Sequence, residues 1–273
     1  MTFSNDCVIP TVLSAATEVR LNSDAALQTP DGINTLVECV PYWVLVGAGT
    51  PDESYIGRFR LQSNDASVEP ARFMMSGLNT GDAAFTSIGG TALRAYSINL
   101  PNAAGININA YAQAMVANTV EPKVGAMFTY STTNTGPQTY WQTPESISTG
   151  GTTIDTRTTG GQITLTDAVE ITSLNCVVTP TTAAASTHDV GEFEMQSSDF
   201  SVPFPYKFPI APSYAGLGAA ANQLTNPNGG SWVKYPSGQG IPTAQRCLIN
   251  TYYTNRDQKG VGSKFMGYVS FLK

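Results

Sequence analysis

The sequence predicts an all-β protein made of two tandem β-sandwiches that are related by internal duplication. Three observations lead to this prediction: a twelve-residue stretch that occurs twice, weaker matches that keep the same order along the chain, and many short apolar runs interrupted by turn residues. Only 12% of the 273 residues are charged, whereas the chain contains 25 glycines and 17 prolines. Such a composition is typical of sandwiches and barrels, and the length is sufficient for two cores of ordinary size.

The repeated stretch reads GRFRLQSNDASV at residues 57–68 and GEFEMQSSDFSV at residues 191–202, with seven of the twelve positions identical. Apolar and charged residues alternate in both copies. In the first copy, Phe59 and Leu61 share one side of an extended chain while two arginines share the other. This period of two residues is the pattern of a strand that is buried on one face only.

The weaker matches extend the repeat along the whole chain. They pair INTLVEC (33–39) with ITSLNC (171–176), ARFMMSG (71–77) with YKFPIAP (206–212), NAYAQ (109–113) with NTYYT (250–254), and VGAMFTY (124–130) with MGYVSFL (266–272). The offset between the copies drifts only from 134 to 142 residues. We therefore expect Phe59 to superpose on Phe193, Phe73 to match Phe208, and Gly125 to superpose on Gly267.

The repeat divides the chain into residues 1–135 and residues 136–273, each expected to form one sandwich. Residues 136–161 are rich in Thr, Gly and Ser and poor in apolar residues, which predicts a surface linker with a strand or two at the start of the second sandwich. The expected strands centre on 11–21, 33–46, 54–62, 67–76, 92–100, 105–115 and 123–131, and on 162–178, 189–197, 201–211, 231–235, 245–254 and 264–272. A helical pattern occurs only at residues 214–224.

The four cysteines lie far apart and form no CxxC pair. Cys39 and Cys176 each end a β-rich run of their own copy. We therefore expect both to be buried thiols at equivalent positions of two separate cores, too far apart for a disulfide. The N-terminus lacks the features of a secretory signal, and no apolar run approaches membrane-spanning length, so we expect synthesis in a reducing cytosol.

The charge pattern argues against a protein that mainly neutralises nucleic-acid phosphates. The net charge is −6, and the first basic residue is Arg20, so the N-terminus carries no basic arm. Phosphate-binding chains need clustered positive charge.

The search for catalytic chemistry finds no strong signal. His188 is the single histidine, which is too few for a metal site of the kind found in two-domain cupins, and no GxSxG stretch seats a nucleophilic serine. Phosphate-binding and dinucleotide-binding glycine motifs are absent as well. A pair of carboxylates for glycoside cleavage stays open, but the alternation of Glu192 and Glu194 directs both towards solvent. We expect no enzyme activity, cofactor, catalytic residue or metal site.

A duplicated β-sandwich without these motifs resembles the double jelly-roll major capsid proteins of tailless icosahedral DNA viruses, such as tectiviruses, corticoviruses and adenoviruses. The resemblance covers residues 1–273 and rests on architecture. It implies two upright jelly rolls per subunit, homotrimers that act as pseudo-hexameric capsomers, and an icosahedral shell in the virion. It also implies the partners: further copies of the chain, other capsid proteins at the vertices and an internal viral membrane, without direct nucleic-acid binding.

Two alternatives stay open. The chain could be a tandem-sandwich surface or adhesive protein that binds glycans, or a metal-free carbohydrate-active enzyme on a jelly-roll scaffold. A coat protein is expected to form trimers or shells, whereas the alternatives could be monomeric.

The charged positions of the repeated stretch reverse in sign, because Arg58 and Arg60 correspond to Glu192 and Glu194. Surface drift is one explanation. The other is that the two copies face different neighbours, so that opposite charges meet between subunits. On this second interpretation the four residues are candidate inter-subunit contacts, and reversing both glutamates to arginine should impair assembly while each subunit stays folded.

Overall fold

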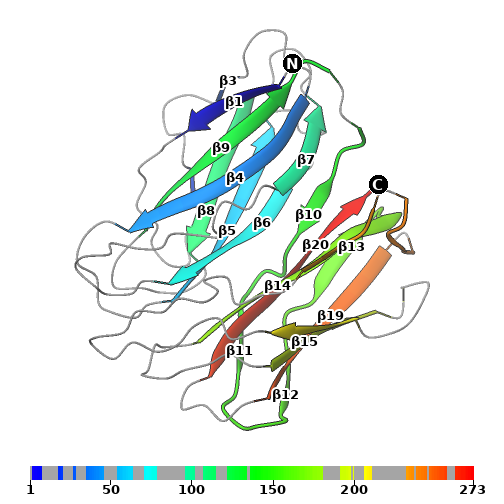
Figure 1. Cartoon of the computed structure of the whole chain (residues 1–273). Coiled ribbons are helices and arrows are strands. Elements are labelled where there is room, and N and C mark those ends of the chain that lie inside the picture. Colours follow the sequence, from blue (N-terminus) through cyan, green and yellow to red (C-terminus); the bar gives the residue numbers. More distant parts are fainter. Residues whose placement is uncertain are drawn as a thin grey trace.

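The computed structural model describes residues 2–7, 18–20, 27–28, 35–45, 54–63, 71–78, 96–101, 107–114, 122–133, 136–180, 191–197, 199, 206–210, 232–236, 238–244, 246–256 and 262–273. Within these ranges the chain forms β-strands and no helix (Figure 1). Consequently, no helix in the described ranges is long and apolar enough to span a membrane.

The strands fall into two series. The first series is β1 (Thr2–Cys7), β2 (Val19–Arg20), β3 (Leu27–Gln28), β4 (Thr35–Leu45), β5 (Ser54–Ser63), β6 (Ala71–Leu78), β7 (Tyr96–Pro101), β8 (Asn107–Ala114) and β9 (Pro122–Ser131). The second series is β10 (Tyr140–Gln142), β11 (Ser148–Gly150), β12 (Arg157–Thr159), β13 (Ile163–Thr166), β14 (Glu170–Pro180), β15 (Gly191–Gln196), β16 (Tyr206–Ile210), β17 (Trp232–Lys234), β18 (Ile241–Pro242), β19 (Arg246–Asn255) and β20 (Ser263–Leu272).

Both series form a jelly roll with the same strand order, and all strand pairs are antiparallel. In the first, the sheets run β1-β9-β4-β7 and β2-β8-β5-β6, with β3 beside β8. In the second they run β10-β20-β14-β17 and β12-β19-β15-β16, with β11, β18 and β13 added at β20, β14 and β19. The predicted fold class, two tandem jelly-roll β-sandwiches related by duplication, is confirmed. Every described sheet draws its strands from one series only, while the boundary at residue 135 stays a prediction.

The register supports the duplication on three strands of one sheet. In β5, Phe59 lies opposite Phe73 of β6, and in β15, Phe193 lies opposite Phe208 of β16. The sequence matches equate the same residues. The neighbours on the other side, in β8 and β19, agree with the match between residues 109–113 and 250–254.

The other sheet carries a second mark of duplication, a β-bulge at the same place in each copy. It falls between Leu36 and Glu38 of β4 and between Ile171 and Ser173 of β14. Bulges are specific local features that persist within related folds, so this shared bulge gives a reference point for comparing the copies.

Measured from the bulge, two expected equivalences are wrong in register. Thr129 and Ser270 lie opposite the residue that follows the bulge, but Gly125 is four residues before Thr129 and Gly267 is three before Ser270. The glycines therefore lie on equivalent strands but on opposite faces, because a slip of one residue exchanges the faces of a strand.

The two cysteines differ in register as well. Cys39 is one residue past Glu38, the first residue after the bulge in β4. Cys176 is three residues past Ser173, the first residue after the bulge in β14. The two cysteines therefore share a face but not a position. Both are buried and neither forms a disulfide, as predicted.

The core of the second sandwich explains why two of its positions are glycine. Met195 and Phe193 of the repeated strand pack on Gly267, where a Cβ would lie 2.7 Å from Met195 Cε and 2.9 Å from Phe193 Cζ. At Gly191, the first residue of the repeated stretch, a Cβ would lie 2.6 Å from the Tyr253 hydroxyl oxygen and 2.7 Å from the Thr254 carbonyl oxygen. Contacts this close leave no room for a larger side chain.

Two expected elements differ from the structure. The single run at 162–178 is two strands in different sheets, β13 and β14, because the chain turns at Asp167, which has a φ of 57°. Asp tolerates this left-handed conformation through local hydrogen bonding. The expected linker at 136–161 contains three strands, β10, β11 and β12, that lie at the edges of both sheets of the second sandwich. The run at 11–21, the pattern at 214–224 and His188 fall largely or wholly outside the described residues.

The two sandwiches meet along β7 and β10, which lie side by side (Figure 1). The Thr139 amide donates to the Ile98 carbonyl at 2.9 Å, and Trp141 Nε1 donates to the Ser97 carbonyl at 2.8 Å. The ring of Tyr96 meets that of Trp141 edge-on, with centroids 5.0 Å apart. The Tyr96 hydroxyl lies 3.4 Å from the hydroxyl of Tyr268 in β20. A buried aromatic cluster of Tyr96, Trp141 and Tyr268 therefore joins the sandwiches.

Candidate functional site

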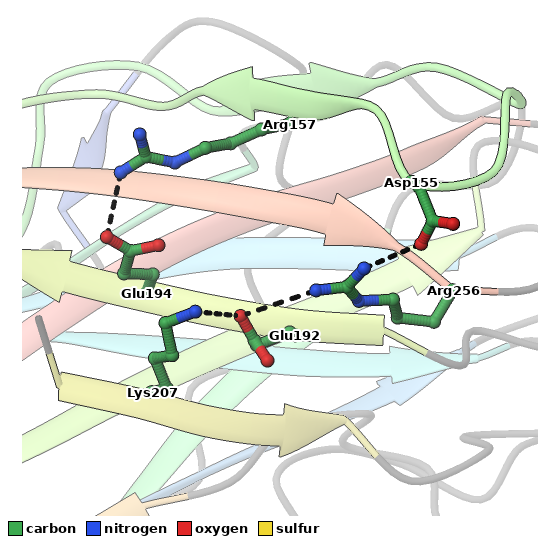
Figure 2. A network of polar contacts seen from close by, with 6 residues as sticks. All are labelled: Asp155, Arg157, Glu192, Glu194, Lys207 and Arg256. Carbon is green, nitrogen blue, oxygen red and sulfur yellow. Dashed lines mark hydrogen bonds and ion pairs between the residues drawn. The ribbon is translucent and has the colours of Figure 1, made fainter.

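The second sandwich carries a cluster of six charged side chains, named here the charged face: Asp155, Arg157, Glu192, Glu194, Lys207 and Arg256 (Figure 2). They come from β12, β15 and β16, from the turn before β12 and from the residue that directly follows β19. Together with Gln196 and Thr254 they line an open depression of about 410 Å³.

The charged face is a network of ion pairs. Arg157 Nη2 lies 2.7 Å from Glu194 Oε1, and Lys207 Nζ lies 2.7 Å from Glu192 Oε1. Arg256 bridges two elements, because its Nη1 lies 2.6 Å from Asp155 Oδ1 and its Nη2 lies 3.8 Å from Glu192 Oε1. The hydrogen bond to Asp155 raises the pKa of Arg256. Three carboxylates and three cations thus balance one another.

On the equivalent face of the first sandwich, the repeated strand contributes two arginines to the ion pairs in place of two glutamates. Arg60 makes a two-pronged pair with Glu18, in which Nε lies 2.8 Å from Oε1 and Nη2 lies 2.5 Å from Oε2. Arg58 Nη1 lies 3.1 Å from Oε2 of Glu145, which belongs to the second sandwich's series. Burial and the nearby charge of Arg58 lower the pKa of Arg72.

The ion pair between Glu18 and Arg60 recurs in the second sandwich with its charges exchanged. Val19, which follows Glu18, lies opposite Ala112. Thr158, which follows Arg157, lies opposite Tyr253. Ala112 and Tyr253 occupy the same place beside the repeated strand. Arg157 is therefore the counterpart of Glu18, and its pair with Glu194 is the counterpart of the pair between Glu18 and Arg60.

An aromatic ring supports both pairs. The guanidinium carbon of Arg60 lies 3.9 Å from the ring centre of Tyr111, and that of Arg157 lies 3.6 Å from the ring centre of Tyr252. The two tyrosines precede Ala112 and Tyr253, so they are equivalent as well. Stacking on a ring favours a cation over a neutral side chain. In both copies an arginine stacks on the equivalent tyrosine. This arginine belongs to β5 in the first copy and to β12 in the second.

The four candidate contact residues are thus all paired within their own chain. This adds a third explanation for the sign reversal, namely that the two partners of an ion pair within the chain exchanged their charges. Arg58 and Arg60 have 12% and 14% of their side chains exposed, and Glu192 is half-buried. The expectation that Glu194 points to solvent is wrong, because only 9% of its side chain is exposed. Sequence reasoning missed these partners because β2 and β12 are too short to show a pattern. A role between subunits stays a prediction.

The ion pairs also change what the replacement of Glu192 and Glu194 by arginine would measure. Glu194→Arg would place a second guanidinium beside Arg157 and remove its partner. Because 45% of the Arg157 side chain is exposed, this pair is only partly buried, but two adjacent guanidinium groups without a carboxylate between them still destabilise the fold. The reversal therefore tests the stability of the sandwich together with assembly, and it does not isolate assembly.

Within the described ranges, no group of three or more His, Cys, Asp or Glu side chains is arranged to hold a metal ion.

Comparison with known proteins shows relatives of the fold. No protein-family model and no curated protein sequence matches the chain. Among solved structures, it is similar to the major capsid protein of Sulfolobus turreted icosahedral virus (STIV), with a TM-score of 0.51 and 10% identity over 100% of this chain and 97% of that one. It is similar to N-glycanase F (PNGase F), with a TM-score of 0.51 and 7% identity over 100% and 96%. It also resembles PNGF-II, at 0.51 and 6%, over 100% and 65%.

At these identities the similarity shows the fold alone. The STIV coat protein and PNGase F both match this chain over its full length, and a shared fold does not imply a shared function. The chain has the double jelly-roll architecture of which the STIV capsid protein is one example.

The pair between Glu18 and Arg60 should make the stability of the first sandwich depend on pH. Burial raises the pKa of Glu18, but hydrogen bonds from Arg60 and the charges of Arg60, Arg58 and Arg72 outweigh this effect, so the pKa lies below its ordinary value of 4.5. Because the folded state has the lower pKa, the stabilisation is present above about pH 4.5 and is lost as the pH falls through the folded value.

Glu18→Gln should therefore lower the free energy of unfolding at pH 7 by about 1 kcal/mol, the range of a partly exposed, two-pronged ion pair. The loss should shrink as the pH falls below 4.5 and the carboxyl group becomes protonated in the folded state, as measured by urea unfolding at pH 7 and at an acidic pH. Glu145→Gln is the matched control, because Glu145 is 80% exposed and should matter little at either pH. An equal effect of Glu18→Gln at both pH values would contradict the assignment.

Proposed function

We propose that this chain is a structural coat protein that self-assembles into the icosahedral shell of a virus, with trimers as pseudo-hexameric capsomers. Support comes from the whole-length correspondence with the STIV major capsid protein, in which both jelly rolls match and 97% of the coat chain is covered. Two copies of one domain in a chain suit such a shell, because three chains then supply six similar domains to a capsomer and fewer association steps are required.

The same proposal assigns the remaining partners and the location. The protein resides in the virion of a DNA virus, contacts its own copies and the capsid proteins at the vertices, and faces an internal membrane without binding the genome directly. The net charge of −6 disfavours direct binding to the phosphates of a genome.

An enzyme is the second candidate, because PNGase F has the same TM-score as the coat protein. The contacts of the charged face favour the structural role. Glu192 and Glu194 accept hydrogen bonds from Lys207 and Arg157, and such pairs hold the strands of a sheet together. An acid–base catalyst instead needs a carboxyl group that can exchange protons with a substrate.

Electron microscopy of the purified protein, combined with analytical ultracentrifugation, tests the proposal. We expect a species near three times 28.9 kDa and, under assembly conditions, closed shells of uniform diameter. A monodisperse monomer at micromolar concentration that forms no particles would overturn the coat function. Release of glycan from a glycopeptide, measured by mass spectrometry, would establish the enzyme instead, and specific binding to immobilised glycans would favour the adhesive protein.

A further inference from the structure

The outer face of β5 and β6 carries three arginines. Arg58 and Arg60 flank the buried Phe59 in β5, and Arg72 of β6 lies directly opposite Arg60. Residues two apart in one strand and residues opposite each other on neighbouring strands share a face of the sheet. The three guanidinium groups therefore lie together on one small area, named here the arginine face. Like charges directly opposite each other destabilise a sheet, so this area favours bound anions.

Two carboxylates neutralise only part of the arginine face. Glu18 pairs with Arg60, and Glu145 pairs with Arg58. Arg72 is half-buried, and its Nη1 donates to the neutral amide oxygen Oε1 of Gln142 at 3.3 Å. Within the part of the chain that the structure describes, no carboxylate forms an ion pair with Arg72. One positive charge of the arginine face thus stays unbalanced there.

The duplication provides an internal comparison for this arginine. Lys207 of β16 corresponds to Arg72 of β6, because each directly precedes a phenylalanine that lies opposite the matched phenylalanine of the repeated strand. Lys207 has its counterion, since its Nζ lies 2.7 Å from Glu192 Oε1. The counterpart of Glu192 is Arg58, which repels Arg72 instead. Equivalent positions therefore carry a neutralised cation in the second sandwich and an unneutralised one in the first.

The electrostatics of Arg72 agree with this comparison. Burial and the nearby charge of Arg58 lower the pKa of Arg72, whereas Glu145 and Glu18 act in the opposite direction without restoring it. An arginine keeps its proton in proteins, so the lowered pKa reflects an unfavourable environment for a charge that persists. An anion bound beside Arg72 would relieve this environment.

We propose that a phosphate group binds between Arg58 and Arg72, where the two sandwiches meet. A guanidinium group presents its donors in a fork that matches the oxygens of phosphate. Glu145 is the displaceable anion of this site, because 80% of its side chain is exposed. Once it moves aside, three arginines and Glu18 leave a charge of +2. A phosphate group of about −1.5 to −2 at pH 7 balances this charge, whereas a single carboxylate balances half of it.

The burial of the arginines limits the form of the ligand. Only 12% of the Arg58 side chain and 14% of the Arg60 side chain are exposed. A free ion or a phosphate attached at one end fits such a recessed position, whereas a phosphodiester carries substituents on two sides. The ligand class is therefore inorganic phosphate and phosphate monoesters. This site is separate from the coat function, so the absence of shells would leave it standing.

The bound phosphate should strengthen the contact between the sandwiches. Arg72 belongs to the first sandwich and donates to Gln142 in β10 of the second, and β10 contacts β6. A ligand that holds Arg72 in place therefore also holds this contact. Because the unfolded chain lacks the site, phosphate should raise the thermal midpoint in proportion to its binding.

Isothermal titration calorimetry of the full chain with inorganic phosphate tests the site, with sodium chloride at matched ionic strength as the reference. Arg72→Gln should weaken phosphate binding at least about tenfold, because it removes a charged hydrogen-bond donor. Lys207→Gln is the matched control, since it removes the same charge at the equivalent position and should leave the affinity unchanged. No phosphate-specific binding, or an equal loss in both variants, would overturn the proposal.

Glu145→Gln provides a test that does not depend on the folding of the arginine variant. It removes the competing carboxylate from a mostly exposed position, so phosphate should bind about two- to fivefold more tightly, the worth of an exposed ion pair. Unchanged or weaker binding would contradict the proposal. Competition with O-phosphoserine distinguishes a monoester ligand from the free ion alone, and equal competition by dimethyl phosphate would contradict the recessed site.

Discussion

Trp141→Ala is expected to lower the free energy of unfolding by about 3–5 kcal/mol, the range for removing a large buried aromatic side chain. Trp141 is only 6% exposed. Its ring packs edge-on against Tyr96, and its Nε1 donates to the Ser97 carbonyl. The substitution thus removes packing and a hydrogen bond at the junction of the sandwiches at once. Urea unfolding followed by far-ultraviolet circular dichroism, which reports the backbone rather than the substituted tryptophan, measures the loss.

Trp141→Phe is the matched variant. It keeps an aromatic ring at the junction but removes the indole donor, so its cost should be clearly smaller than that of Trp141→Ala. A cost below about 1 kcal/mol for Trp141→Ala would mean that the junction contributes little to stability.

Phe193→Ala and Phe59→Ala should each lower the free energy of unfolding by about 3–5 kcal/mol. Both side chains are fully buried, and Phe193 contacts the rings of Phe208 and Phe265 within the second core. If each phenylalanine belongs to a separate core, the two losses should add within about 0.5 kcal/mol in the double variant.

Chemical denaturation of the four chains that make up this double-mutant cycle measures the coupling. Phe193→Leu serves as the conservative control and should cost less than about 1.5 kcal/mol, because most of the apolar volume is retained. A coupling energy above 1 kcal/mol between positions 59 and 193 would contradict the two-core organisation.

The structure of the core could be predicted wherever a strand carried a strong pattern. Phe59 and Phe193 were equated from the repeated stretch, and their cross-strand partners Phe73 and Phe208 confirm that match. The pattern was informative because each strand has one buried face, and a period of two residues then reveals the face and the register together.

The pattern failed where burial did not alternate. β14 and β20 are buried on both faces, so their sequences contain no period that could place Cys176 or Gly267 relative to the first copy. The short edge strands β10, β11 and β12 lay in a polar segment and were expected to be mostly linker. Edge strands are held by neighbouring backbone and by single contacts such as the one between Trp141 and Ser97, and neither leaves a periodic signal.

The candidate site was the least predictable part. The reversal of charge between Arg60 and Glu194 was visible in the sequence, but its meaning depended on Glu18 and Arg157. These partners lie 42 and 37 residues away along the chain, in strands of two and three residues.

By itself, the sequence determined the all-β class, the internal duplication and the face of the repeated strand that enters each core, because these properties follow from local alternation and from order along the chain. The tertiary structure alone decided which charges pair, and it buried every residue of β20 from Phe265 to Phe271 while burying only alternate residues of β9 from Ala126 to Tyr130. Equivalent strands acquire different surroundings when one copy packs against the other. That difference arises from docking between distant segments, which no local pattern encodes.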